Sequence, residues 1–235
     1  MRKLLFEDYF NGNSIDESKW NVLEYNRMAN AELQAYLRDN VKVENGNLII
    51  TSRCENRLER EFTSGKITTK GKFNFCKGLV EVVAKLPTAV GSWPAIWMMP
   101  EDFTGGWPRC GEVDIMEHCG HKLNEAFFSI HTKDYNHVVG TQFTKTIIIP
   151  KLIEGFHKYS IIWEEDSISW YVDDVLYYEV HRHQLSKEDN WPFNKNFYLI
   201  INSAVGGNFC EGHLEKKDFP CEFIIKSVKV YSEEN

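Results

Sequence analysis

Short runs of alternating apolar and polar residues recur along the whole 235-residue chain, and they are rich in β-branched and aromatic side chains. A period of two predicts strands with one buried face, because successive side chains of a strand point to opposite sides of a sheet. Gly, Asn, Asp or Pro bounds most of these runs, as expected where a strand ends in a turn. The expected strands are residues 41–43, 48–51, 79–86, 159–164, 168–172, 197–202 and 223–231.

Two tight turns join neighbouring runs. Asn45-Gly46 is a strong hairpin signal because both residues tolerate a positive φ, and Asp173-Asp174 occupies an equivalent place between two later runs. Helical periodicity is credible only over residues 183–189, where Ser186 could cap a single turn. The pattern therefore predicts an all-β sandwich, in which two curved antiparallel sheets face each other and long loops connect the strands.

The sequence is continuous in character from end to end. It contains no linker, internal repeat or low-complexity stretch, and no window approaches the ~18 apolar residues of a membrane-spanning helix. An all-β domain of this length is common, so we expect residues 1–235 to form one domain, acting as a monomer. Seven Trp and ten Tyr exceed what a core requires, and such a surplus often marks a surface on which flat ligands such as sugar rings stack.

Charge and cysteine content narrow the range of partners. A formal net charge of −7 argues against nucleic acid and anionic membranes, since both are bound through Lys and Arg, and it weakens the case for a sulfated polysaccharide. The six cysteines have no spacing typical of a zinc site, so they are buried thiols or disulfides, with the pairing open. No metal ligand is predicted.

The first residues resemble the basic start of a secretion signal, but Glu7 and Asp8 end the apolar run too early for one. We expect a secreted or cell-surface protein whose export signal is absent from this chain, and a cytoplasmic location is the alternative.

The segment from Gly111 to His118 carries the most chemical information. In a regular strand Glu112 and Asp114 would share a face, whereas Glu117 would point to the other side. A β-bulge, with one extra residue at Ile115 or Met116, would return Glu117 to the acidic face. Three carboxylates on one face repel one another, so such a cluster is costly unless it has a use.

Glycoside hydrolysis is one such use, because it needs a carboxylate on one side of the anomeric carbon and a carboxylic acid on the other. Glu112 would be the nucleophile and Glu117 the acid/base, while Asp114 would position a neighbour and tune its pKa. The plainer alternative is a solvated acidic edge strand that prevents aggregation, and the spacing by itself favours that alternative. The tryptophans just before the carboxylates in sequence shift the balance toward a sugar site.

Several segments together resemble glycoside hydrolase family 16, and within it most closely the laminarinase group, which has a bulged Glu-x-Asp-x-x-Glu. The resemblance covers nearly the whole chain. The segments that carry it are residues 6–12, 30–36, 64–67, 78–81, 85–87, Trp93-Pro94-Ala95-Ile96-Trp97-Met98-Met99-Pro100, Gly111-Glu112-Val113-Asp114-Ile115-Met116-Glu117 and 202–208.

The resemblance implies a β-jelly-roll sandwich with an open cleft on its concave face, and retaining endo-hydrolysis of 1,3-β-D-glucosidic bonds in laminarin-type glucans. It implies that Trp107 stacks on a sugar beside the cleavage point, and that His131 lies beside the acid/base. Lys66 stands where the family has Arg, and it would donate as a point charge rather than as a fork. The implied substrate-binding residues are Asn30, Lys66, Trp93, Trp97, Trp107, His131 and Asn202.

Many members of the family hold a structural Ca²⁺ through a Glu near the first strand, a carbonyl near an Asn-Gly turn and an Asp before the last strand. Glu7 and Gly46 match the first two positions, but Lys226 occupies the third. A cation in place of a carboxylate ligand makes a calcium site unexpected. The sequence therefore predicts no cofactor.

Two other functions remain open at this stage. One is the same fold and mechanism acting on a mixed-linkage 1,3-1,4-β-glucan or on a galactan, as in agarase-like and porphyranase-like relatives, because loops set specificity on a shared scaffold. The other is a non-catalytic glucan-binding lectin. A binding module has no need for the costly cluster of three acids, which makes an enzyme the preferred interpretation.

Overall fold

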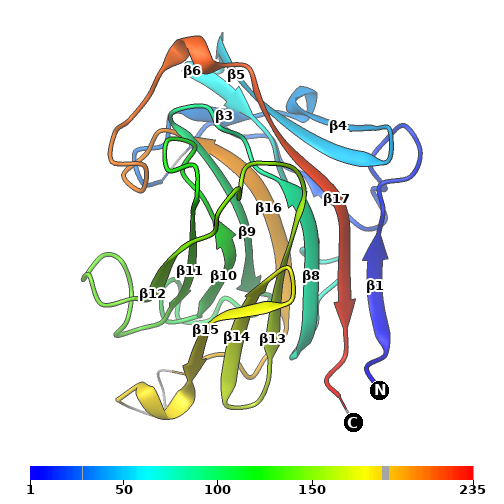
Figure 1. The fold of residues 1–235 in the computed structure, drawn as a ribbon, viewed down its shortest axis with the longest axis vertical. Helices are drawn as coiled ribbons and strands as arrows, with labels where there is room; N and C mark the ends of the chain where they lie inside the picture. The colour runs from blue at the N-terminus through cyan, green and yellow to red at the C-terminus, as the bar shows by residue number, and fades with distance from the viewer. Residues whose placement is uncertain (28, 187–190, 235) are drawn as a thin grey trace.

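In the computed structural model of the chain, residues 1–27, 29–186 and 191–234 are described, and they form two curved β-sheets (Figure 1). The strands are β1 (Leu4–Asp8), β2 (Asn21–Val22), β3 (Gln34–Tyr36), β4 (Val41–Glu44), β5 (Asn47–Arg57), β6 (Arg60–Ser64), β7 (Lys66–Thr68), β8 (Gly78–Lys85), β9 (Ser92–Pro100), β10 (Glu112–Glu117), β11 (Glu125–His131), β12 (Phe143–Ile148), β13 (His157–Trp163), β14 (Ser167–Val172), β15 (Val175–His181), β16 (Phe197–Val205) and β17 (Cys221–Tyr231). Short 3₁₀ turns are η1 (Arg38–Asn40), η2 (Arg182–Gln184) and η4 (Lys216–Asp218).

The larger sheet has ten strands in the order β15-β14-β13-β8-β17-β5-β6-β3, with β1 beside β17 and β4 beside β5. The smaller sheet has seven, in the order β12-β11-β10-β9-β16-β7-β2. Because β1 pairs with β17, the two ends of the chain lie close together (Figure 1). The predicted all-β sandwich is confirmed. One pairing departs from it, since β3 runs parallel to β6.

All seven expected strands are present, and so are both expected turns. Asn45 and Gly46 have φ values of 52° and 69°, and Asp173 and Asp174 have 49° and 67°, as the two-residue hairpin requires. The expected helix at 183–189 is represented by the 3₁₀ turn Arg182–Gln184, while residues 187–190 lie outside the described part of the chain. Among the described residues, no helix has the length and apolar character needed to cross a membrane.

One continuous cluster of buried apolar side chains fills the space between the sheets. Its largest members are aromatic, and Trp163 and Trp170 of the larger sheet have no exposed surface. The indole Nε1 of Trp170 donates a hydrogen bond of 2.8 Å to the backbone carbonyl of Asp114 in the smaller sheet. A side chain of one sheet therefore supports the backbone of the strand that carries the three acids.

A disulfide joins Cys119 and Cys210, which are 91 residues apart in sequence. The other four cysteines, Cys54, Cys76, Cys110 and Cys221, are free thiols. The sequence left this pairing open. It connects the loop after β10 to the loop after β16, on the same side of the smaller sheet.

Candidate active site

A β-bulge in β10 brings the three acids to one face. Asp114 lies opposite Trp97 of β9 and Met116 lies opposite Ile96, so that Ile115 is an extra residue in the pairing. The pairing with β11 shifts over the same interval, between Asp114 and Glu117. Ile115 and Met116 consequently both point into the core, and Glu117 returns to the face of Glu112 and Asp114. The sequence-based expectation of a bulge at this position holds.

The acids lie where two hollows meet on the face of the smaller sheet that turns away from the core. The hollows have volumes of ≈ 230 Å³ and ≈ 330 Å³. Both are lined by Asn30, Trp93, Glu112 and Glu117, so the carboxyl groups of Glu112 and Glu117 can be reached from either side. Together the hollows form a cleft of the kind that binds a chain across its reactive groups.

Indole N–H groups hold the two glutamates. Trp107 Nε1 donates to Glu112 Oε2 at 2.7 Å, and Trp93 Nε1 donates to Glu117 Oε1 at 3.0 Å. His131 Nε2 lies 3.2 Å from Asp114 Oδ2 and 4.0 Å from Glu112 Oε1. Asp114 Oδ2 has no hydrogen-bond partner, so this contact is a close approach of the two groups and not a hydrogen bond. Fixed donors of this kind restrict the carboxyl groups to one orientation.

Burial raises the pKa of all three carboxyl groups, because surroundings of low polarity disfavour their charged forms. The pKa of Glu112 rises to about 8, through burial and then through the charge of Asp114. Burial raises the pKa of Asp114 to about 7. The pKa of Glu117 lies well above its usual range, through burial and then through Asp114. The cluster therefore retains protons at neutral pH, and Glu117 is kept in the acid form.

These shifts predict how Asp114→Asn changes stability. Because the folded-state pKa of Asp114 is raised from 3.8 to about 7, the folded protein keeps a proton that the unfolded chain loses, and stability falls as pH rises through that window. The variant cannot ionise. Since one pKa unit corresponds to about 1.4 kcal/mol and the shift is about three units, the variant should be more stable than the parent at pH 8 by up to about 4 kcal/mol, with little difference at pH 4.

Melting curves from pH 4 to pH 8 test this expectation, and Asp166→Asn, on an exposed loop, is the control. A midpoint difference that does not change with pH would mean that Asp114 is not a buried acid of raised pKa.

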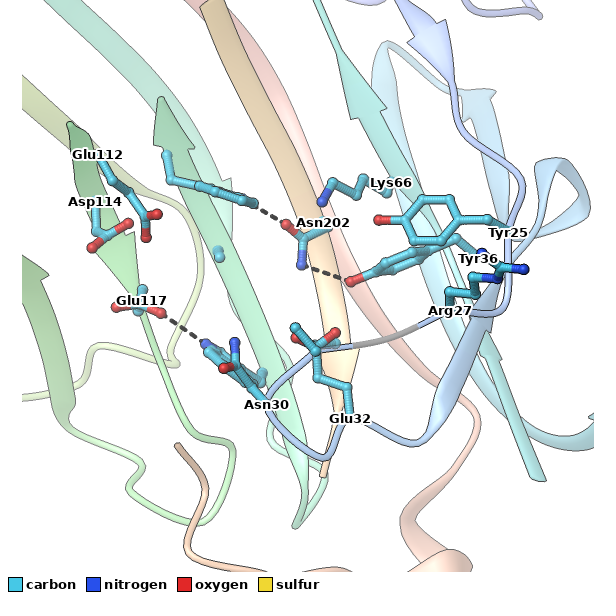
Figure 2. A pocket seen from close by; sticks show the side chains of 15 residues that line it. Tyr25, Arg27, Asn30, Glu32, Tyr36, Lys66, Glu112, Asp114, Glu117 and Asn202 are labelled. Carbon is cyan, nitrogen blue, oxygen red and sulfur yellow. Dashed lines mark hydrogen bonds between the residues drawn. The ribbon is translucent and has the colours of Figure 1, made fainter. Parts of the chain in front are cut away.

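The second side of the cleft is built from β16, β7 and the loop before β3 (Figure 2). Trp97 Nε1 donates to Asn202 Oδ1 at 2.7 Å, and Asn202 Nδ2 donates to the hydroxyl of Tyr36 at 3.0 Å. Lys66 Nζ lies 4.8 Å from the centre of the Trp97 ring and 5.6 Å from that of Tyr36. Burial lowers the pKa of Lys66 to about 8, although Glu32 and Glu112 act in the opposite direction.

Nearly all the residues selected from the sequence meet in this cleft. Asn30, Lys66, Trp93, Trp97, His131 and Asn202 line its hollows with the three acids. Trp107 lies at its edge, where the ring packs between His137, with centroids 4.8 Å apart, and an apolar patch that includes Met99 and Tyr198.

Sequence reasoning missed several lining residues, namely Tyr25, Arg27, Glu32, Tyr36, His137, Gln142, Asn208 and Phe209. Most of them lie in loops outside any periodic pattern. Glu32, Tyr36 and Asn208 lie in segments that carry the family resemblance, and Phe209 follows directly after one of them. The Phe209 ring stacks on Trp93 with centroids 4.8 Å apart. Gly207 has a φ of +81°, and a Cβ there would lie 3.0 Å from the Trp93 ring. A larger residue at 207 would therefore displace that ring.

Comparison with known proteins agrees with this geometry. Residues 29–216 match the family model described as Glycosyl hydrolases family 16. The chain belongs to glycosyl hydrolase family 16.

Two relatives and one solved structure show how close this family 16 chain is to known members. It is 38% identical to a "Beta-glucanase" of Rhodothermus marinus over 97% of this chain and 85% of the relative. It is 35% identical to "Glucan endo-1,3-beta-glucosidase A1" of Niallia circulans over 98% of this chain and 38% of the relative. The structure of the laminarinase from Rhodothermus marinus superimposes with a TM-score of 0.96 at 38% identity, covering 100% of this chain and 99% of that one.

The calcium ligands held by many family 16 members do not fit the residues of this chain. The carbonyl oxygen of Glu7 accepts a hydrogen bond from Lys19 Nζ at 2.8 Å, and Lys229 lies opposite Glu7 in the pairing of β1 with β17. Lys226, at the third ligand position, extends over the ring of Phe156 at 5.8 Å. The ammonium group of Lys19 beside Glu7, and a lysine at the third ligand position, both oppose a hard cation.

Adding Ca²⁺ to the chelator-treated family 16 enzyme should therefore leave its melting midpoint unchanged, because only binding to the folded state would raise it. Mg²⁺ at the same ionic strength is the control. A rise of several degrees with Ca²⁺ alone would show that the lysines do not exclude the ion.

Trp107 offers a test of the cleft edge. Trp107→Ala should lower kcat/KM on laminarin by about 1–3 kcal/mol in transition-state free energy, a size borrowed from the stacking of nucleobases on aromatic rings. Trp107→Phe keeps a ring but removes the N–H that Glu112 accepts, so it separates stacking from that hydrogen bond. An unchanged kcat/KM in Trp107→Ala would remove the residue from the site, and a collapsed melting midpoint would assign it to the core.

Proposed function

We propose that this family 16 glycoside hydrolase is a retaining endo-1,3-β-glucanase that uses Glu112 as nucleophile and Glu117 as acid/base. The observation that carries the proposal is the bulge in β10, which places both glutamates at the junction of the two hollows. The names of the relatives, beta-glucanase, glucan endo-1,3-beta-glucosidase and laminarinase, support the substrate.

The reaction follows from two carboxyl groups with different protonation. The Glu112 carboxylate attacks the anomeric carbon, while Glu117 gives its proton to the glycosidic oxygen, and the bond between that oxygen and the anomeric carbon breaks. The product of this step is a glycosyl ester of Glu112. Glu117, now ionised, takes a proton from water, and the water oxygen attacks the anomeric carbon and releases Glu112. Two inversions leave the configuration unchanged, and Glu117 is protonated again.

Asp114 has a separate part in this scheme. Glu112 must be ionised to attack, yet the contact between Glu112 and Asp114 raises the pKa of Glu112 and lowers that of Asp114, so it favours the proton on Glu112. We assign to Asp114 the role of accepting that proton before the attack, so that Glu112 becomes charged. Donation from Trp107 Nε1 to Glu112 favours the same distribution, because a hydrogen bond to a carboxylate stabilises its charged form. His131, beside Asp114, would add positive charge to the cluster when protonated.

Charge in the cleft favours a neutral glucan. Four acids line it, Glu32, Glu112, Asp114 and Glu117, against two cations, Arg27 and Lys66. Recognition of sulfate requires Arg or Lys in excess, so a sulfated galactan fits poorly. Trp93, Trp97 and the other rings offer faces for stacking, and Asn30, Lys66 and Asn202 offer hydrogen bonds to sugar hydroxyl groups.

Reducing-sugar release from laminarin, lichenan, agarose and carrageenan tests the substrate. Laminarin should be cleaved with the highest kcat/KM, and size separation of early products should show long oligosaccharides, as endo-cleavage requires. Carrageenan or agarose as the preferred polymer would contradict the substrate but leave the catalytic residues untouched. Binding of laminarin without cleavage would contradict the whole proposal.

We also propose that the protein acts outside the cytoplasm. The Cys119–Cys210 disulfide supports this location, because disulfides persist in oxidising compartments. A polymeric substrate supports it too.

A further inference from the structure

Two histidines and a glutamate meet beside the disulfide, and none of the three lines the cleft hollows. The ring centroids of His121 and His213 lie 4.4 Å apart. The potential ligand atoms of His121, Glu211 and His213 all lie within 4.8 Å of one another. Two imidazoles and one carboxylate are a ligand set that zinc takes in proteins, with water in the fourth position.

The chain holds these residues in place before any ion binds. The disulfide fixes Cys119, two residues before His121, next to Cys210, which precedes Glu211 directly. Each half-cystine begins a tight turn: Lys122 N donates to the Cys119 carbonyl at 2.7 Å, and His213 N donates to the Cys210 carbonyl at 3.0 Å. Ligands from two distant segments thus lose little freedom on binding, and this lowers the entropic cost of forming a site.

His121 supplies an independent indication of a ligand. Its Nδ1 and Nε2 atoms are both shielded from solvent, and neither has a hydrogen-bond partner. Across the described ranges, no other histidine leaves both ring nitrogens in this state. A shielded polar atom without a partner is destabilising, and coordination of a metal by one of these nitrogens would relieve that cost.

Glu211 is only weakly engaged elsewhere. Its Oε1 pairs with Lys122 Nζ at 2.8 Å, and the glutamate side chain of this pair is 59% exposed. Exposed ion pairs contribute about 0–1 kcal/mol, so a divalent ion can displace the lysine or use the second carboxylate oxygen. Competition from Lys122 for Glu211 should weaken metal binding without preventing it.

We propose that His121, Glu211 and His213 form a binding site for one divalent transition-metal ion of the zinc class. Imidazole nitrogens distinguish it from a calcium site, which requires oxygen ligands. The site is structural, because it joins two loops outside the cleft and touches no reacting group. It is independent of the catalytic proposal.

Calorimetric titration of the chelator-treated, disulfide-intact protein with Zn²⁺ at pH 7.5 tests the site. The expected result is one ion per chain and a melting midpoint that rises with Zn²⁺ concentration. His121→Ala and His213→Ala should each weaken binding at least tenfold and remove the rise in midpoint.

The matched control is the double variant H181A/H183A. Its histidine rings stack with centroids 5.3 Å apart, and Glu179 lies 3.0 Å from His181, so it removes a similar group from another surface. This variant should bind Zn²⁺ as the parent does.

Three results would overturn the proposal: the parent shows no saturable Zn²⁺ binding, His121→Ala binds Zn²⁺ as tightly as the parent, or H181A/H183A loses as much Zn²⁺ affinity as His121→Ala. The acids of the cleft are a competing site, since Glu112, Asp114 and His131 also bring ligand atoms within 4.8 Å. Binding that disappears in Asp114→Asn but persists in His121→Ala would assign the ion to the cleft.

Discussion

Glu112→Gln is expected to lower kcat on laminarin by at least about 10⁴-fold, or roughly 5.5 kcal/mol in activation free energy. An amide has no charge with which to attack the anomeric carbon, so the glycosyl ester cannot form. The side chain keeps its volume and can still accept the N–H of Trp107, so the fold should survive. Initial rates on laminarin beside a melting curve measure both effects.

The matched control is Glu222→Gln, an exposed glutamate of β17 in the larger sheet, which should retain full activity. Glu112→Ala adds a sharper test. With an activated aryl glycoside and added azide, the anion can occupy the space of the missing carboxylate and attack from that face, so the product should be the α-glycosyl azide. Activity of Glu112→Gln near that of the parent, or a β-azide from Glu112→Ala, would remove Glu112 as nucleophile.

Glu117→Gln should reduce kcat on laminarin by about 10²–10⁴-fold, the range that general acid–base catalysis contributes. A glucoside with an activated aryl leaving group needs little protonation, so its first step should proceed at a rate close to that of the parent. The deficit should therefore depend on the leaving group, which is a result that damage to the fold cannot produce.

Azide separates the two glutamates from each other. In Glu117→Ala the glycosyl ester still forms from an activated substrate, and azide can attack it without a general base, so the product should be the β-azide. An equal deficit on laminarin and on the activated substrate would mean that Glu117 is not the acid. An α-glycosyl azide from Glu117→Ala would mean that Glu117 is the nucleophile and Glu112 the acid/base.

The parts of the site that could be predicted from sequence are those encoded in local patterns. Regular alternation over Glu112–Glu117 would place Glu117 on the face opposite Glu112 and Asp114. The consecutive apolar residues Ile115 and Met116 fit a bulge, because a bulge lets both side chains point into the core. These six residues therefore suggest the bulge, and the resemblance to family 16 made it the preferred interpretation. The hairpin at Asn45-Gly46 is predictable for the same kind of reason, because its geometry depends on two adjacent residues.

Features that depend on distant segments could not be predicted. Arg27 lies in the cleft because of a loop in which Asn30 and Ala31 adopt φ values of 53° and 58° and break every periodic pattern. Only the family resemblance singled out residues 30–36 in this loop. The parallel pairing of β3 with β6 depends on chain path rather than on side-chain pattern.

The pairing of Cys119 with Cys210 has the same origin, because six cysteines allow 15 complete pairings. His137 reaches the cleft only because its loop folds over Trp107. In each case the information lies in the packing of segments and not in local composition.

The hydrogen bond from Trp170 to the Asp114 carbonyl has a consequence for how this enzyme can be altered. The bulge that sets the relative positions of Glu112 and Glu117, the proposed nucleophile and acid, is held from inside the sandwich by the fully buried Trp170. Reactivity and substrate choice are therefore adjustable by different residues. We expect substitutions at Trp170 to change the rate of bond cleavage on every glucan alike, and substitutions in the cleft loops to change the choice among glucans.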